Sequence, residues 1–179
     1  MTVTAFVGIS GAGKTYLLTK ICAMSQAVSV SASQLIRDAQ NANHDANQGS
    51  EIARLANTED MQTVLVAAMR EFRSEHSGIV VLDAHVVIDK DTRLDRIAPE
   101  VFNDLGVSRI VHLVVEPELI AERRGRDMGR SRPVRSLSEL EIQQNISRDH
   151  ARHVAKTIGV DYLEVDGGEP ELIRLVIPD

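Results

Sequence analysis

The feature that most constrains this chain is a glycine-rich octapeptide near its amino end. Residues 8–15 read GISGAGKT, which matches the pattern G-x-x-x-x-G-K-[ST] in full. The octapeptide follows a largely apolar run over Val3–Val7, which predicts a buried strand, and it leads into residues 14–24, whose apolar positions have helical spacing. The alternative is a glycine-rich turn that binds nothing. The full pattern, placed between a strand and a helix, favours a loop that binds phosphate groups.

The residues of this loop have distinct expected roles. Glycines let successive backbone N–H groups converge on phosphate oxygens, and the positive end of the following helix dipole points to the same place. Lys14 supplies a point charge for the outer phosphates, and Thr15 supplies a hydroxyl for Mg²⁺. We therefore expect ATP with Mg²⁺ to bind the loop. The expected donor-binding residues are Ser10, Gly11, Ala12, Gly13, Lys14 and Thr15.

The rest of the chain alternates between strand and helix patterns. Expected strands cover residues 28–30, 79–82, 110–115 and 161–165, and expected helices cover residues 31–40, 58–72, 99–105, a segment from 117, and 136–158. A capping-box pattern opens the 31–40 helix at Ser31–Gln34, and the polar residues 41–50 predict a mobile loop. Continuous apolar strands that alternate with helices indicate parallel pairing in a sheet covered on both faces. We expect a three-layer α/β/α fold with a five-stranded, mainly parallel sheet.

Composition narrows the class of protein. The 179 residues have the length of one domain, which we expect to span residues 1–179. No apolar run approaches the roughly 20 residues of a membrane span, and the amino end lacks a secretory-signal pattern. Cys22 is the only cysteine, so no internal disulfide can form, and a cytoplasmic protein without a membrane partner is expected. The net charge of -6 argues against general nucleic-acid binding and leaves nucleotides as the expected partners.

Two polar residues follow the apolar run at 79–82. Asp83 closes that run, and in P-loop proteins an acid at this place holds Mg²⁺, usually through water. The alternative role for Asp83 is to cap the next turn. His85 lies two residues later and can reach the same pocket, although a lone histidine is often purely structural. We expect Thr15 and Asp83 at the metal, and we include Asp83 and His85 among the candidate catalytic residues.

The arginines are concentrated in one segment. Six of the 16 fall within residues 123–135, and the chain has only four lysines. Gly125, Gly129 and Pro133 inside this stretch predict that part of it is a loop. An arginine-rich loop over a phosphate-binding site neutralises charge on a moving phosphoryl group and excludes water. We expect a lid at about residues 125–136; the alternative is a basic surface patch for nucleic acid or an acidic partner.

The segment SASQLIRDA, residues 31–39, suggests where a second substrate binds. It resembles the segment after the second strand of nucleoside monophosphate kinases, which has Ser or Thr, then Leu and Arg. In that family the arginine contacts the monophosphate, and the resemblance implies this role for Arg37, with Ser31 beside it.

A more specific resemblance runs over most of the chain. Asp83-Ala84-His85 is similar to the Asp-x-His of archaeal-type adenylate kinases and their eukaryotic nuclear relatives, which are linked to ribosome maturation. The later residues in that family's order are Arg123, Arg124, Asp127, Arg130, Ser131, Arg132, Glu141, Gln144 and Arg148. The helix with Arg54 and Gln62 resembles the family's acceptor-side helix, with altered spacing.

This resemblance implies transfer of the ATP γ-phosphoryl group to a nucleoside monophosphate. Lys14, Arg130 and Arg132 would stabilise the transferring group, and Arg124 would lie near the donor nucleotide. The residues implied on the acceptor side are Ser31, Arg37, Arg54 and Gln62. The polar loop at 41–50 and the charged segment at 86–96 depart from the family pattern, so the acceptor base stays open.

Other function classes share parts of this pattern. A kinase for a small alcohol or a nucleoside would differ mainly in its acceptor pocket. A GTPase switch is disfavoured because the chain has no N-K-x-D motif and residues 83–86 are not D-x-x-G. The chain is also short for the extra subdomain of larger ATPase machines. An assembly factor that binds RNA or a ribosomal protein is the third class; the net charge argues against RNA, and the arginine cluster argues for it.

Overall fold

The computed structural model describes residues 1–46, 58–90, 93–127 and 133–166. In chain order the elements are β1 (Thr2–Val7), α1 (Lys14–Ala23), β2 (Val28–Ser31), α2 (Ala32–Ala46), α3 (Thr58–Glu75), β3 (Ile79–Asp83), β4 (Val87–Asp89), β5 (Leu94–Arg96), α4 (Pro99–Asp104), β6 (Val107–Leu113), α5 (Pro117–Arg126), α6 (Leu137–Ile158) and β7 (Asp161–Val165). The predicted alternation of strands and helices is therefore confirmed.

The main sheet is the five-stranded parallel sheet that the sequence predicts, in the order β2-β3-β1-β6-β7. The register aligns one residue from each strand in a row across the sheet: Val30, Leu82, Ala5, Ile110 and Tyr162. This row belongs to one hydrophobic cluster, and the residues that point the other way belong to a second. The sheet is thus buried on both faces, which explains its continuous apolar strands.

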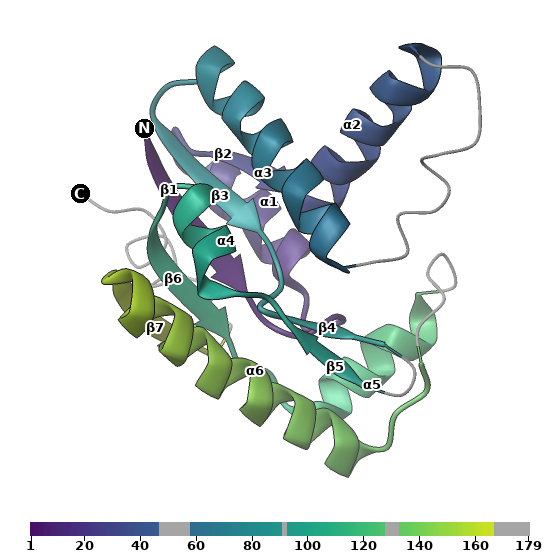
Figure 1. Ribbon diagram of the computed structural model, residues 1–179. Helices are drawn as coiled ribbons and strands as arrows, with labels where there is room; N and C mark the ends of the chain where they lie inside the picture. Colours follow the sequence, from purple (N-terminus) through teal and green to yellow (C-terminus); the bar gives the residue numbers. More distant parts are fainter. Residues whose placement is uncertain (47–57, 91–92, 128–132, 167–179) are drawn as a thin grey trace.

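Helices cover the two faces unequally. The first cluster gathers side chains from α2, α3, α4 and α6. In Figure 1, α4 and α6 lie in front of the sheet, and α2 and α3 stand in the upper part of the view. The second cluster gathers mainly α1 and α5 behind the sheet. The three layers follow from this arrangement.

The strand order places a crevice at the carboxyl ends of β1 and β3. After β1 the chain crosses toward β2 and β3 on one side, and it later returns to β6 on the other side of β1. Such a switch point separates the connections on either side and leaves a crevice where ligands bind in open α/β sheets. The loop at residues 8–13 and Asp83 both lie at this edge.

The α2 region differs from the sequence expectation. α2 continues through Ala46, so the first part of the predicted loop at 41–50 is helical, and residues 47–50 lie outside the described residues. Polar residues do not by themselves end a helix, and no glycine or proline interrupts residues 32–46. The predicted capping box is also wrong, since the Gln34 amide bonds to Asp38 and Arg37.

A small hairpin occupies the charged segment that sequence patterns did not place. β4 and β5 pair antiparallel, with Val87 opposite Arg96 and Asp89 opposite Leu94. The Ile97 N–H donates to the Val86 carbonyl at 2.9 Å, and this hydrogen bond extends the pairing at the base of the hairpin. The hairpin follows β3 directly and so lies next to the crevice (Figure 1).

Other boundaries agree with the sequence to within a few residues. β7 has the predicted ends, and α6 begins after Ser136, whose hydroxyl accepts from the Glu139 N–H in a capping box. β6 runs from Val107 to Leu113, earlier than the predicted 110–115. Among the described residues, no helix is both long enough and apolar enough to cross a membrane.

Candidate functional site

The glycine-rich loop forms a tight turn between β1 and α1. Gly11 and Gly13 have φ angles of 88° and 93°, in the left-handed region that favours glycine. A Cβ on Gly13 would lie 2.8 Å from Nη1 of Arg123, and one on Gly11 would lie 2.8 Å from Cγ of Arg124. The loop therefore needs glycine for its backbone angles, and at Gly11 also for the close approach of the Arg124 side chain.

Lys14 lies at the base of this loop with only 5% of its surface exposed. Its Nζ donates to the Gly8 carbonyl at 3.1 Å and lies 3.8 Å from Oδ1 of Asp83. A buried ammonium group requires such partners, because burial without them is costly. Lys14 is thus held in the crevice, next to the end of β3.

Thr15 and Asp83 form the predicted pair. The Thr15 hydroxyl donates to Oδ2 of Asp83 at 2.8 Å, although the residues are 68 positions apart in the chain. Mg²⁺ prefers oxygen ligands and in nucleotide sites takes most of them from water and phosphates. A hydroxyl and one carboxylate beside a phosphate-binding loop fit that ion. No group of three or more metal-ligating side chains occurs among the described residues.

His85 lies against the same loop. Its Nδ1 is 2.8 Å from the Gly8 carbonyl oxygen and 3.5 Å from Nζ of Lys14. A carbonyl oxygen only accepts, so this contact assigns the proton to Nδ1 and leaves the lone pair of the neutral ring on Nε2. His85 is therefore placed beside Lys14 with an acceptor atom on the other side of its ring.

Two arginines from α5 dock on the loop from the opposite side. The Arg123 guanidinium donates to the Ala12 carbonyl, and Nε of Arg124 donates to the Ser10 carbonyl at 2.9 Å. Both contacts join residues more than 100 positions apart. Arg124 is thus next to the loop, and its expected place near the donor nucleotide stays a prediction. Gly125, expected in a lid loop, instead lies inside α5.

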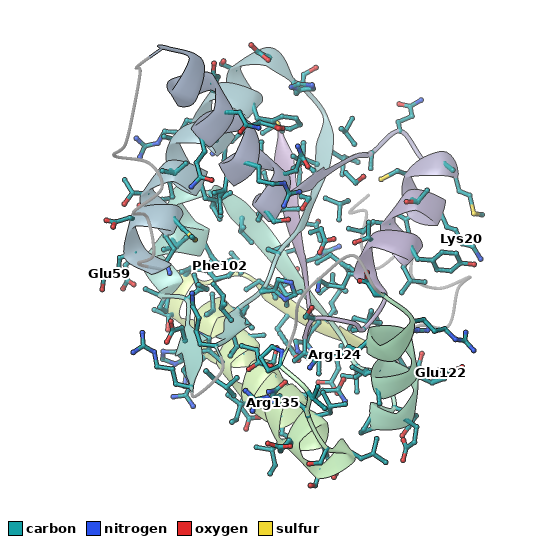
Figure 2. All side chains as sticks on the ribbon, turned by 90° about the vertical axis from the view of Figure 1, so that its right-hand side faces the viewer. Lys20, Glu59, Phe102, Glu122, Arg124 and Arg135 are labelled. Atoms are coloured by element: carbon teal, nitrogen blue, oxygen red, sulfur yellow. The ribbon has the colours of Figure 1, made fainter. Side chains whose placement is uncertain are left out.

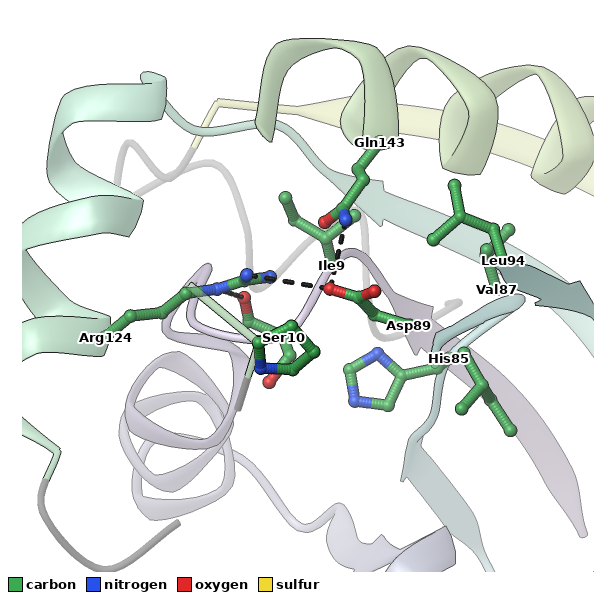
Figure 3. Close-up of a pocket in the computed structure, with 10 residues that line it drawn as sticks. Ile9, Ser10, His85, Val87, Asp89, Leu94, Arg124 and Gln143 are labelled. Carbon is green, nitrogen blue, oxygen red and sulfur yellow. Dashed lines mark hydrogen bonds and ion pairs between the residues drawn. The ribbon is translucent and has the colours of Figure 1, made fainter. Parts of the chain in front are cut away.

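A second cluster, which sequence reasoning missed, centres on Asp89 of the hairpin. Its carboxylate accepts from Nη2 of Arg135 at 2.9 Å. It also accepts from Nε2 of Gln143 at 3.0 Å and lies 3.8 Å from Nη1 of Arg124, as the dashed lines in Figure 3 show. Figure 2 shows Arg124 and Arg135 reaching the same region from α5 and from the segment before α6. The one sequence signal was an acid that closes the apolar run Val86–Ile88.

Two adjoining cavities meet at the loop. The larger, about 1010 Å³ and here called the P-loop cavity, is lined by the loop, by Asp83 and by the start of α2. The smaller, about 450 Å³ and here called the hairpin cavity, lies between the loop, the hairpin and α6 (Figure 3). Ser10 and His85 line both cavities. A ligand that spans the two would pass His85.

The residues expected on the acceptor side are separated by the structure. Ser31 and Arg37 line the P-loop cavity together with Lys14 and Thr15. Gln62 instead lines a third hollow, between the start of α3, the β5 strand and α6, and does not line the P-loop cavity. Arg54, Arg130 and Arg132 lie outside the described residues, and these three predictions stay predictions.

Comparisons with known proteins agree with this architecture. A family model described as an AAA domain matches residues 7–141, which is well over half of the chain. No curated protein sequence matches the chain.

Solved structures share the fold at low sequence identity. The tunicamycin resistance protein of Deinococcus radiodurans is 14% identical, with a TM-score of 0.53, over 89% of this chain and 96% of that one. A gluconokinase from Sinorhizobium meliloti is 19% identical, with a TM-score of 0.53, over 98% and 89%. A shikimate kinase from Bacteroides thetaiotaomicron is 15% identical, with a TM-score of 0.50, over 92% and 86%. These likenesses show a fold of the P-loop kinase type.

Proposed function

The chain belongs to the AAA-domain family of P-loop proteins, and from this premise we propose that it is an ATP-dependent phosphotransferase whose acceptor is a nucleoside monophosphate. One observation supports this most directly. The P-loop cavity brings Lys14, Thr15, Asp83 and Arg37 to the walls of one space of about 1010 Å³. A triphosphate on the loop and a second phosphate at the start of α2 would then face each other.

The donor side of the site is built from the loop. Backbone N–H groups of the turn and the first turn of α1 cradle the phosphates, and Lys14 adds a fixed positive charge at the outer one. The Thr15 hydroxyl and the Asp83 carboxylate would hold Mg²⁺, which supplies further neutralisation of charge on the phosphates. Arg123 and Arg124 close the loop from α5.

The acceptor side is built from the β2–α2 junction. Arg37 donates from Nη2 to Oε1 of Gln34 at 2.7 Å, which keeps its guanidinium on the cavity side of the first turns of α2. A guanidinium binds a phosphate through two parallel hydrogen bonds. Ser31 lines the same wall and offers a hydroxyl.

Transfer between the two phosphates needs positioning and charge neutralisation more than covalent chemistry from the protein. Lys14 provides the fixed charge, and we propose that Arg130 and Arg132 add to it from the lid segment. AMP and the deoxynucleoside monophosphates are the first candidate acceptors, in line with the resemblance to archaeal-type adenylate kinases.

A kinase for a small alcohol is the second candidate. The place of His85 favours it, because a hydroxyl could meet the Nε2 acceptor of this ring close to Lys14, and the neighbouring folds include a shikimate kinase and a gluconokinase. In this arrangement His85 would accept the hydroxyl proton as a general base.

One assay separates these candidates. ATP, Mg²⁺ and each common nucleoside monophosphate are mixed with the protein, and the diphosphate product is measured. We expect a diphosphate product, and we expect Arg37→Lys to lower kcat/KM for the acceptor by about tenfold or more with little change in ATP affinity, because lysine keeps the charge but loses the fork.

The control is Arg70→Lys, an exposed position on α3. Phosphorylation of a small alcohol with no diphosphate product would favour the second candidate. ATP hydrolysis without any acceptor would favour a regulatory or assembly role.

A further inference from the structure

The hairpin cavity has apolar walls and a few polar groups, the combination typical of sites for small organic ligands. Its 450 Å³ lies within the range of about 300–1,000 Å³ found for such sites. The apolar wall residues are Ile9, Val87, Ile88, Leu94 and Pro133. A ligand with hydroxyls on every carbon would leave many of them unpaired against these walls, which is costly. A planar ring with polar atoms only at its edge fits better.

The charge of Asp89 is already neutralised on the protein side. Nη2 of Arg135 donates to one carboxylate oxygen and Nε2 of Gln143 to the other, and Nη1 of Arg124 lies 3.8 Å away as an ion pair. The Asp89 carboxylate is only 13% exposed. Asp89 therefore influences a ligand in the cavity indirectly, by fixing the orientation of the side chains that donate to it.

Gln143 is the group that Asp89 orients most directly. Its side chain is buried, with 6% exposed, and it descends from α6 to the carboxylate (Figure 3). A carboxylate only accepts hydrogen bonds, so the amide atom at 3.0 Å is the nitrogen Nε2. The amide is thereby fixed in one of its two flips. No residue that the structure describes donates to the other end, Oε1, and Gln143 lines the cavity.

We infer that the hairpin cavity holds the base of the acceptor nucleotide and that Oε1 of Gln143 accepts a hydrogen bond from an exocyclic amino group of that base. This inference rests on the proposed function, because it places the acceptor phosphate in the P-loop cavity. The two cavities adjoin at Ser10 and His85, and His85 Nδ1 is 3.5 Å from Nζ of Lys14. A base in the hairpin cavity would thus connect to the P-loop cavity past Ser10 and His85.

The expected specificity follows from the fixed flip. A base with a carbonyl in place of the amino group brings an acceptor against Oε1, and neither atom can donate. Loss of a hydrogen bond to a buried polar group lowers affinity by about 10- to 100-fold. We expect kcat/KM to be higher by that factor for AMP than for IMP, or for CMP than for UMP.

The variant Gln143→Met tests this role, because methionine is similar in length and cannot accept the same hydrogen bond. We expect the ratio of kcat/KM within the favoured pair to fall to about one, while the KM for ATP stays the same. The matched control is Glu141→Met, at an exposed position on the same helix. A wild-type ratio near one for both pairs, or a Gln143→Met protein that weakens ATP instead, would overturn the inference.

A binding experiment separates this inference from the proposed reaction. Calorimetry measures adenosine, inosine, cytidine and uridine binding to the wild-type protein in the presence of Mg²⁺ and a nonhydrolysable ATP analogue. We expect the amino base of one pair to bind about tenfold or more tightly, and Leu94→Trp, which fills the cavity, to remove that binding while the ATP analogue still binds.

The two failures give different results. If no monophosphate is phosphorylated but the preference for the amino base appears and depends on Gln143, the proposed reaction fails and the base site stands. If monophosphates are phosphorylated but adenosine binds no better than inosine, nor cytidine than uridine, the base site fails and the reaction stands.

Discussion

At the scale of single residues, Lys14 joins the loop chemistry to the fold. Its ammonium is buried between the Gly8 carbonyl and the Asp83 carboxylate, so its position is set before any phosphate arrives. A charge that is already in place needs no reorganisation when charge develops on a transferring group, and such groups contribute strongly to catalysis.

We predict that Lys14→Met lowers kcat/KM for ATP at least about 100-fold, because the outer phosphate loses its fixed charge while the side chain keeps a similar length. Steady-state kinetics and calorimetry with an ATP analogue measure the effect. Lys20→Met, on the same helix but over the Tyr16 ring, is the control. Unchanged turnover in Lys14→Met would contradict the assignment of the loop.

We expect Asp83→Asn to lower Mg²⁺-dependent activity about 100-fold and to affect metal-free nucleotide binding much less. Asparagine keeps the shape and can still accept from the Thr15 hydroxyl, but it removes the charge that attracts the metal. Nucleotide affinity is measured with Mg²⁺ and with a chelator. An equal loss under both conditions would instead assign Asp83 to the structure of the turn.

At the scale of elements, the hairpin is connected to α5 and α6 by one carboxylate. Asp89 of β4 contacts Arg124 of α5, Gln143 of α6 and Arg135 just before α6. These elements share no local sequence relation, and the contacts fix their relative positions around the hairpin cavity. Breaking a buried pair by removing one charge leaves the partner charges uncompensated.

We therefore predict that Asp89→Asn destabilises the fold by about 1–3 kcal/mol, measured by urea unfolding. Asp95→Asn is the matched control on the other strand of the hairpin. Asp95 pairs with Arg93, whose side chain is 74% exposed, so solvent screens this pair and its loss should destabilise the fold much less. Equal destabilisation by the two variants would show that the Asp89 cluster does not hold the elements together.

At the scale of the whole molecule, a buried histidine connects stability to pH. His112 of β6 is fully buried, and its Nε2 lies 3.0 Å from the Ser147 hydroxyl of α6. Burial, reinforced by the positive charges of Lys14 and Arg148, lowers the pKa of His112 from 6.5 to about 4. Between these values the unfolded chain binds a proton at this site and the folded chain does not.

We predict that the free energy of unfolding is largest above pH 6.5 and decreases as the pH falls toward 4, by about 3 kcal/mol at most from this site. Urea unfolding at several pH values measures the slope. His112→Gln should flatten it, leaving a smaller slope from His150, whose pKa is also lowered by burial. A slope that is the same in wild type and His112→Gln would exclude His112 as the cause.

The sequence by itself determined those parts of the site whose residues are adjacent in the chain. Residues 8–15 contain the loop, the start of the helix and the lysine in one stretch. Asp83 follows an apolar run that predicts a strand without any knowledge of its tertiary contacts. Parallel pairing then brings the carboxyl ends of β1 and β3 together, so the Thr15–Asp83 contact follows from the topology. The sheet and most helices were predicted for the same reason.

Only the tertiary structure decided the hairpin cavity and its cluster. Arg135 and Gln143 lie 46 and 54 positions from Asp89 in the chain, so no local sequence pattern predicts their contacts with it. The polar residues 41–46 were predicted as a loop because they have little apolar content, and only the tertiary structure shows that their backbone continues α2. Gln62 lies on a predicted helix, but the hollow that it lines depends on how α3 packs against β5 and α6. This packing places Gln62 in a different hollow from Lys14. Local chemistry is encoded along the chain, whereas the meeting of distant elements is set by how their apolar faces pack.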